Sequence, residues 1–209
     1  MPAPGADMST ARDEILRRVR VAAVAEPVER TYRRHGTLDL EERVALFCER
    51  VGEYRAEVRR CEDVAHEVAG LGVRSLVVPG GVPPAWRTDA VELAPDDDLS
   101  PRELDAFDGA LTGCTAAIAE TGTIVLTAGA AEGRRVLTLV PDLHVCVVGE
   151  QQIVQLLPEA LARLEELSAA TSPITFVSGP SATSDIELSR VEGVHGPRKL
   201  VVLVVKEIP

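Results

Sequence analysis

Three polar, glycine-containing segments in the C-terminal half carry the residue types that hold small anions. They span residues 119–123, 178–187 and 193–198. Glycines let the main chain approach a ligand closely, and hydroxyls and free N–H groups suit phosphate or carboxylate oxygens. The second segment follows an apolar run and the third precedes one. Because loops at strand ends form the ligand crevice of open α/β sheets at a topological switch point, we expect the three segments to form one ligand site.

The residues that we predict to bind this ligand share hydroxyl groups, small turn-forming side chains or a charge. They are Thr121, Gly122, Thr123, Gly179, Pro180, Ser181, Thr183, Asp185, Glu187, Gly196 and Arg198. The guanidinium of Arg198 suits a carboxylate or phosphate because it can donate two parallel hydrogen bonds. The carboxylate of Asp185 is placed to cap a helix, and contact with a ligand or a metal is the alternative.

Two histidines differ in their setting. His195 lies in a glycine-containing segment, which predicts an accessible ring that serves as a general acid or base or as a donor to a carboxylate. Bracing of the loop is the alternative for His195. His144 begins an apolar run and is interpreted as structural. Neither has a second His or Cys at metal-ligand spacing, so we predict no metal site and no cofactor. The acidic run at 96–98 is interpreted as a solvated turn.

The elements that must position these segments alternate between strands and helices. Apolar alternation at 56–60, a short helix at 63–71 and an apolar strand at 75–78 predict a mostly parallel sheet flanked by helices. Further strands are expected at 91–93, 115–119, 123–127, 136–140, 144–148, 174–177 and 200–205. An amphipathic helix is expected over 151–167, which Pro158 should kink or restart.

Two helices are expected before this α/β domain. Thr10 with Asp13 resembles a capping box for the first, and Asp39 with Glu42 forms one for the second. We therefore expect a helical N-terminal extension over residues 1–50 and an α/β domain over 51–209.

The composition agrees with this class of protein. Of the 209 residues, 45% are hydrophobic but only 3% are aromatic, so Val, Leu, Ile and Ala must build the core, as in strands buried on both faces. The net charge of −11 argues against nucleic-acid binding. The longest apolar run, 200–205, is far shorter than the roughly 18 residues of a membrane span, and the N-terminus does not resemble a secretory signal.

The cysteines indicate a reducing compartment. Cys48, Cys61, Cys114 and Cys146 are widely spaced, which supports neither a zinc site nor an iron–sulfur cluster. Four scattered thiols without a secretory context are typical of a cytoplasmic protein.

Four short motifs together resemble the LUD domain of the lactate utilization protein C family. They are A-I-A-E-T-G-T at 117–123, P-D-L-H at 141–144, G-P-S-A-T-S-D-I-E at 179–187 and G-V-H-G-P-R at 193–198. The resemblance covers roughly residues 50–205. It implies a fold like that of the NagB/RpiA/CoA-transferase superfamily. It also implies a role in the bacterial oxidation of L-lactate to pyruvate beside two iron–sulfur proteins, in which this chain is the component without clusters.

The resemblance also gives Glu120 a candidate role. CoA transferases of this superfamily carry a nucleophilic glutamate in a similar Glu-x-Gly context, which makes Glu120 a candidate nucleophile. A structural glutamate bonded to loop N–H groups is the alternative. Three functions therefore stay open: an accessory subunit that binds a small organic acid, an acyl- or phosphoryl-transfer enzyme with Glu120 and His195 as catalytic residues, and a ligand-sensing regulator.

Overall fold

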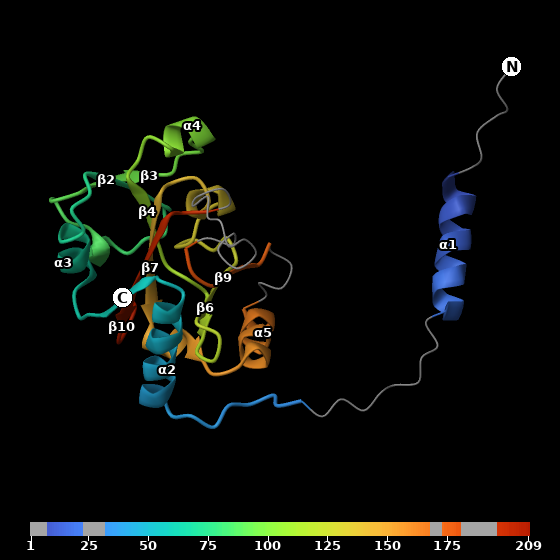
Figure 1. Ribbon diagram of the computed structural model, residues 1–209. Helices are drawn as coiled ribbons and strands as arrows, with labels where there is room; N and C mark the ends of the chain where they lie inside the picture. Colours follow the sequence, from blue (N-terminus) through green and yellow to red (C-terminus); the bar gives the residue numbers. More distant parts are fainter. Residues whose placement is uncertain (1–7, 23–31, 168–172, 181–195) are drawn as a thin grey trace, which may run out of the picture. The chain divides into compact units, whose positions relative to one another are not determined.

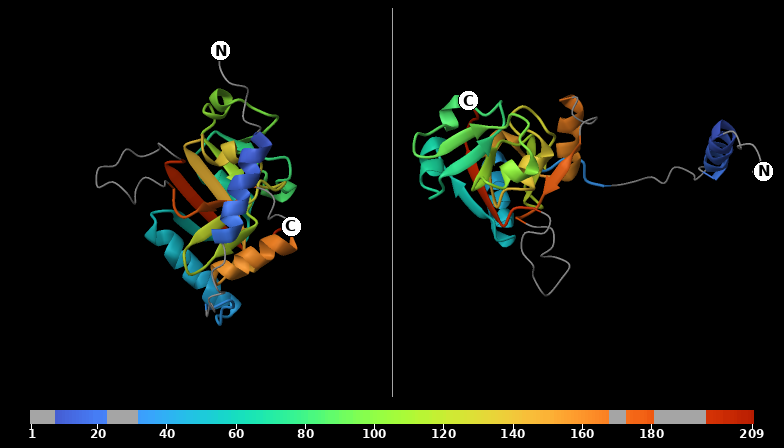
Figure 2. Two further views of the ribbon diagram at one scale, coloured as in Figure 1. Left: turned by 90° about the vertical axis from the view of Figure 1, so that its right-hand side faces the viewer. Right: turned by 90° about the horizontal axis from the view of Figure 1, so that it is seen from above.

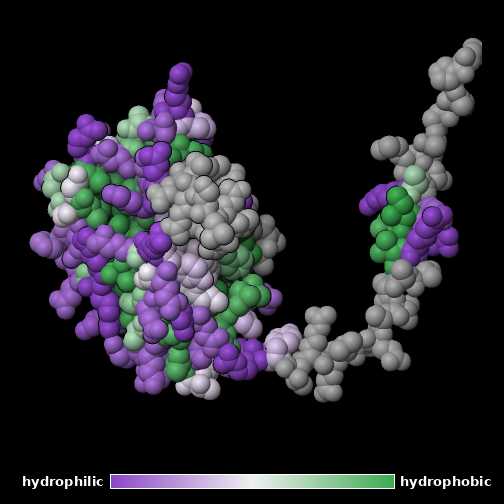
Figure 3. All heavy atoms as spheres, in the orientation of Figure 1, coloured by the Kyte–Doolittle hydropathy of each residue, from purple (hydrophilic) through white to green (hydrophobic). Residues whose placement is uncertain are grey.

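The computed structural model describes residues 8–22, 32–167, 173–180 and 196–209. The chain divides into two compact units, of which the first ends at Arg33 and the second begins at Arg34. In the first unit, helix α1 (Met8–Ala22) is held locally by ion pairs of Glu14 with Arg17 and Arg18. Ile15 and Val19 are exposed, and Figure 3 shows an apolar strip between two hydrophilic faces of this helix.

The second unit is built on a six-stranded, fully parallel sheet (Figure 1). Its order is β1-β10-β7-β4-β2-β3. The strands are β1 (Glu57–Arg60), β2 (Ser75–Val78), β3 (Glu92–Pro95), β4 (Gly109–Thr112), β7 (Leu143–Gly149) and β10 (Lys199–Val205). The two long central strands, β7 and β10, are buried along nearly their whole length, which explains their almost unbroken runs of valine and leucine.

A four-stranded sheet of order β8-β5-β6-β9 packs beside the parallel sheet. Its strands are β5 (Ala116–Ile118), β6 (Thr123–Leu126), β8 (Ile153–Val154) and β9 (Thr175–Val177). Strands β5 and β6 form an antiparallel hairpin, and β9 pairs antiparallel to β6 at the edge. One face of this second sheet packs toward the parallel sheet, and its other face packs against α5.

Apolar side chains arrange these elements in layers. One core contains α2 (Leu40–Glu53), the second sheet and one face of β7 and β10. A second core covers the opposite face with α3 (Val64–Ala69) and the short helix η1 (Pro84–Trp86). Helix α5 (Leu157–Glu166) closes the far side of the second sheet, so α3 and α5 lie at opposite ends of the stack (Figure 2).

The second helix belongs to the α/β unit rather than to an N-terminal extension. Val44, Phe47 and Val51 of α2 are buried in the core with β10 and the second sheet. The division of the chain near residue 34 therefore differs from the expected boundary at residue 50, because the apolar stripe of α2 is part of the main core.

The predicted α/β fold with a mostly parallel sheet is confirmed, and so are most of the predicted strands. The capping box predicted for α2 at Asp39 is formed, and helix α4 (Pro101–Leu104) begins with another at Ser100. The strand expected at 136–140 is wrong: residues Arg135–Thr138 form the 3-10 helix η2. Only a short turn fits there, because Leu137 packs against β2 and β4 while Leu139 stays exposed.

The helix expected over 151–167 is also shorter than predicted. Residues Glu150–Gln152 form the 3-10 helix η3, and β8 follows because Ile153 and Val154 pair with β5. Pro158 lies in the first turn of α5 and so restarts the helix, one of the two expected outcomes. The short strand β4 was not predicted, since its sequence G-A-L-T carries small residues buried on both faces.

Candidate functional site

A chain of three hydroxyl groups links the first predicted segment to the second. The Oγ1 atoms of Thr121 and Thr123 lie 2.8 Å apart, and Thr123 Oγ1 lies 2.7 Å from Ser178 Oγ. The antiparallel pairing of β6 with β9 causes this contact. Ile124 is opposite Val177, so the residue before Ile124, Thr123, lies opposite the residue after Val177, Ser178. Ser178 was not named as a site residue; its position at the end of an apolar strand was the available signal.

Both segments also pack against the C-terminal end of α2. Gly122 has φ 58°, and a Cβ atom there would lie 2.8 Å from the carbonyl carbon of Arg50. Gly122 therefore needs both left-handed backbone and close approach, which only glycine provides without strain. A Cβ atom at Gly179 would lie 2.8 Å from Cβ of Tyr54, just beyond the same helix.

The third segment meets the second where Gly196 approaches Pro180. A Cβ atom at Gly196 would lie 3.3 Å from the carbonyl oxygen of Pro180. Arg198 extends to Asp142, with 3.4 Å between Nη1 and Oδ2, and its side chain is 60% exposed. The Arg198 guanidinium is thus within reach of an anion at the surface, because its ion pair is long and solvated.

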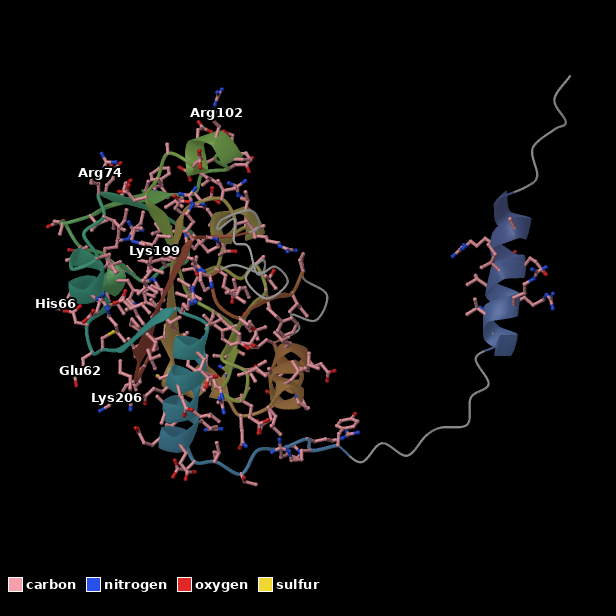
Figure 4. The ribbon with its side chains drawn as sticks, in the orientation of Figure 1. Glu62, His66, Arg74, Arg102, Lys199 and Lys206 are labelled. Carbon is pink, nitrogen blue, oxygen red and sulfur yellow. The ribbon has the colours of Figure 1, made fainter. Side chains whose placement is uncertain are left out.

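This meeting point lies at the amino end of the parallel sheet. In Figure 4 the labelled Lys199 and Lys206 mark the two ends of β10, and the third segment precedes Lys199. The three segments thus meet at the start of β10 rather than at the carboxyl ends of the parallel strands, because they connect through the second sheet and enter β10 from its amino end. We call the described residues 121–123, 178–180 and 196–198 the motif cluster.

Glu120 is held by a neighbouring amide. Its Oε1 accepts a hydrogen bond of 3.2 Å from Nε2 of the buried Gln155. The carbonyl oxygen of the Gln155 side chain accepts from the main-chain N–H groups of Thr37 and Leu38. Gln155 thus links Glu120 to the residues that precede α2, and the role of Glu120 stays a prediction.

Five predicted site residues lie outside the described residues. They are Ser181, Thr183, Asp185, Glu187 and the candidate catalytic residue His195. The described ones that the structure brings together are Thr121, Gly122, Thr123, Gly179, Pro180 and Gly196, with Arg198 two residues further along the chain.

His144 occupies the core rather than the surface. Its ring is 1% exposed, and Nε2 lies 2.8 Å from Oγ1 of Thr112 on the neighbouring strand β4. Burial lowers the pKa of His144 to about 4, so the ring is neutral at physiological pH. This environment agrees with the structural role that its sequence position predicts.

Neither metal-binding groups nor membrane-crossing helices were found in the described part of the chain. Within it, no group of three or more His, Cys, Asp or Glu side chains is arranged to hold a metal ion. The helices of the same residues all lack the combination of length and hydropathy that crossing a bilayer requires.

The fold and the motif cluster define the LUD domain family, and the chain belongs to it: the family's model, described as the LUD domain, matches residues 94–205. A solved relative has the same architecture. The crystal structure of a DUF162 family protein from Deinococcus radiodurans superimposes with a TM-score of 0.71 at 38% identity, covering 81% of this chain and 99% of that one.

Curated relatives carry a more specific name. A protein of Deinococcus radiodurans named "Lactate utilization protein C" is 52% identical over 133 residues, which is 63% of each chain. Its namesake in Shouchella clausii is 32% identical over 54% of this chain and 50% of its own length. The matches thus span between about half and two thirds of these relatives.

Proposed function

We propose that this chain is the cluster-free component of a bacterial, cytoplasmic system that oxidises L-lactate to pyruvate. In this proposal it acts with iron–sulfur partner proteins and binds a small organic anion at the motif cluster. The observation that carries the proposal is the contact between the described parts of the three motif segments, in a chain that is 52% identical over 133 residues to a protein named lactate utilization protein C.

The chemistry of the motif cluster supports a carboxylate ligand. Thr121, Thr123 and Ser178 form a row of three hydroxyl groups, and their two mutual hydrogen bonds use two of the three O–H donors. One O–H is left to donate to a carboxylate, and Arg198 provides a cation. Lactate and pyruvate each carry a carboxylate, a group that accepts hydrogen bonds from a hydroxyl and from a guanidinium.

The burial and the raised pKa values of the cysteine thiols support the proposal that this component carries no iron–sulfur cluster. Cys48 and Cys61 are half-buried, and Cys114 and Cys146 are buried. A hydrogen bond with Cys146 and burial raise the pKa of the Cys114 thiol, and burial raises the pKa of Cys61 to about 11. Since iron–sulfur clusters bind thiolates, protonated and scattered thiols are poor ligands.

A thermal-shift series tests the ligand. The purified chain is measured with L-lactate, pyruvate, phosphate, nucleotides and CoA. A ligand at one hundred times its Kd adds about 2.7 kcal/mol to the free energy of unfolding, so lactate or pyruvate should raise the melting temperature clearly.

Thr123→Val should remove this shift, because it deletes the central hydroxyl of the row without changing side-chain volume. Thr138→Val, which changes an equally buried threonine in η2, is the control. A shift with CoA alone would instead favour the acyl-transfer alternative.

Co-purification tests the partners. The tagged chain is isolated under anaerobic conditions from cells that also express the two candidate iron–sulfur proteins. The proposal expects a complex whose absorption shows clusters that the isolated chain lacks. If the chain never associates and its deletion leaves growth on lactate unchanged, the proposed role is wrong.

A further inference from the structure

The parallel sheet has a topological switch point that the motif cluster does not use. From β2 the chain proceeds to β3 on one side, whereas from β4 it proceeds to β7 on the other side, and β2 and β4 are neighbours. Connections that leave two adjacent parallel strands in opposite directions open a crevice at their carboxyl ends, where α/β proteins bind ligands. Beside this point, a solvent-open hollow of about 420 Å³ is lined by residues that follow β2 and β3 and by the loop over 128–134. Its volume is within the usual range for small-molecule sites.

Two loops form firm walls for this hollow. The N–H of Gly81 donates to the carbonyl oxygen of Ala130 over 2.9 Å, and a Cβ atom at Gly81 would lie 2.5 Å from the Ala130 backbone. The buried carboxylate of Glu132 accepts from the N–H groups of Thr127 and Gly129, which fixes the second loop from inside. Because these contacts are internal to the protein, the hollow keeps its shape without a ligand.

The charged lining is set by Arg134. Its guanidinium makes a two-pronged ion pair with Asp96, donates to Asp98 over 2.9 Å and donates to the carbonyl oxygen of Leu99. The Asp96 side chain is 5% exposed, so the interpretation of 96–98 as a solvated turn is wrong at this residue. The Arg134 guanidinium lowers the pKa of the Asp96 carboxyl. Asp98, by contrast, is 92% exposed at the rim, and its carboxylate can accept further hydrogen bonds beside the one from Arg134.

These groups favour a neutral ligand that is rich in hydroxyls. Two carboxylates face one guanidinium, so the lining repels a strongly anionic molecule. A carboxylate at the rim accepts hydrogen bonds from a vicinal diol, as acidic residues do with ribose in dinucleotide-binding folds. Pro79, Ala128 and Ala130 supply a small apolar side on which a flat ring can rest. The main-chain N–H groups of Gly80 and Ala130 have no acceptor in the described part of the chain and can donate to such a ligand.

We propose that this switch-point hollow binds a nucleoside, with its ribose diol on Asp98 and its base over the apolar side. This site is separate in position and in ligand chemistry from the motif cluster. A test of nucleoside binding is therefore independent of the proposed role in lactate oxidation.

Isothermal titration of the full chain with adenosine and with 2′,3′-dideoxyadenosine tests the proposal. Adenosine should bind, and the dideoxy compound should bind at least about tenfold more weakly, since it lacks the two donors to Asp98. Asp98→Asn should weaken adenosine binding by about tenfold, because an uncharged amide is a poorer acceptor and its side chain is too exposed to affect folding.

A plug variant locates the site. A Cβ atom at Gly80 meets no atom within 4 Å, so Gly80→Leu places its side chain in the open space of the hollow. This variant should lose adenosine binding. Gly52→Leu is the matched control, because a Cβ atom at Gly52 in α2 also meets nothing within 4 Å. Absence of adenosine binding at millimolar concentration, equal binding of the two nucleosides, or full binding by Gly80→Leu would each overturn the inference.

Discussion

At the scale of single residues, Gly122 is the position where the motif cluster depends most on backbone geometry. Gly122→Ala should destabilise the chain by about 1–3 kcal/mol, since a Cβ atom there would combine left-handed backbone with contact to Arg50 and Val51. Urea unfolding of both proteins measures the difference. Gly52→Ala should have the opposite sign, with a gain of roughly 0.5–1 kcal/mol, because it replaces an uncrowded glycine within a helix. Equal stability of Gly122→Ala and the wild type would contradict the geometry.

His144 predicts a pH dependence of stability. Burial lowers its pKa in the folded chain to about 4, whereas an unfolded chain has a histidine pKa near 6.5. Between these values the unfolded chain binds more protons, so the stabilisation is fully present above pH 6.5 and is lost as the pH falls toward 4. From pH 7 to pH 5 this one residue should remove about 2 kcal/mol from the free energy of unfolding.

The variant His144→Gln isolates this effect. Its free energy of unfolding should fall less steeply between pH 7 and pH 5 than that of the wild type, by about the same 2 kcal/mol. His66→Gln, which makes the same replacement at an exposed histidine of α3, is the control for the substitution itself. Parallel curves for His144→Gln and the wild type would show that this ring titrates in the same way in both states.

At the scale of elements, α2 both supports the core and positions the motif cluster. Phe47 is fully buried, so Phe47→Ala should cost about 3–5 kcal/mol of stability. Leu16→Ala in α1 should have little effect on the unfolding of the α/β unit, because Leu16 is 37% exposed and belongs to the other compact unit. Chemical unfolding followed by circular dichroism separates the two cases, and a loss below 1 kcal/mol for Phe47→Ala would contradict the assignment of α2 to the core.

Local patterns were sufficient to predict most elements but not their register or their partners. The runs of β7 and β10 and the caps at Asp39 and Ser100 are encoded within a few residues. The apolar run after Arg135 looks like a strand on its own, and only packing of Leu137 against two distant strands makes it a short helix. In the same way, Ile153 becomes a strand residue because β5 pairs with it from more than 30 positions away.

The site shows the same limit. Glycines and hydroxyls identified the motif segments from sequence, because turns and polar loops have strong residue preferences. Their place at the amino end of the sheet follows from the insertion of the second sheet, which no local pattern indicates. The ion pair of Asp96 with Arg134 joins residues that are 38 positions apart, so no local pattern distinguishes Asp96 from the solvated carboxylates beside it.

At the scale of the whole molecule, the α/β unit contains the complete set of hydrophobic clusters found among the described residues. A chain that begins at Arg34 should therefore fold cooperatively, with a melting temperature within a few degrees of the full chain. Scanning calorimetry of the two proteins checks this. A truncated chain without a cooperative transition would show that residues 1–33 are required for the fold.

The most direct test of the proposed function is to locate lactate on the folded chain by methyl NMR. The methyl groups of Val51, Ile124 and Val177 surround the motif cluster, whereas those of Val78 and Val82 lie on the stretch that runs past the switch-point hollow. Titration with L-lactate or pyruvate should shift the first set and leave the second unchanged, and Thr123→Val should abolish the shifts. The claim that distant motifs form a carboxylate site rests on the row of hydroxyls that joins the first two segments and on the approach of Gly196 to Pro180. Spectra in which neither acid moves Val51, Ile124 or Val177 would contradict it.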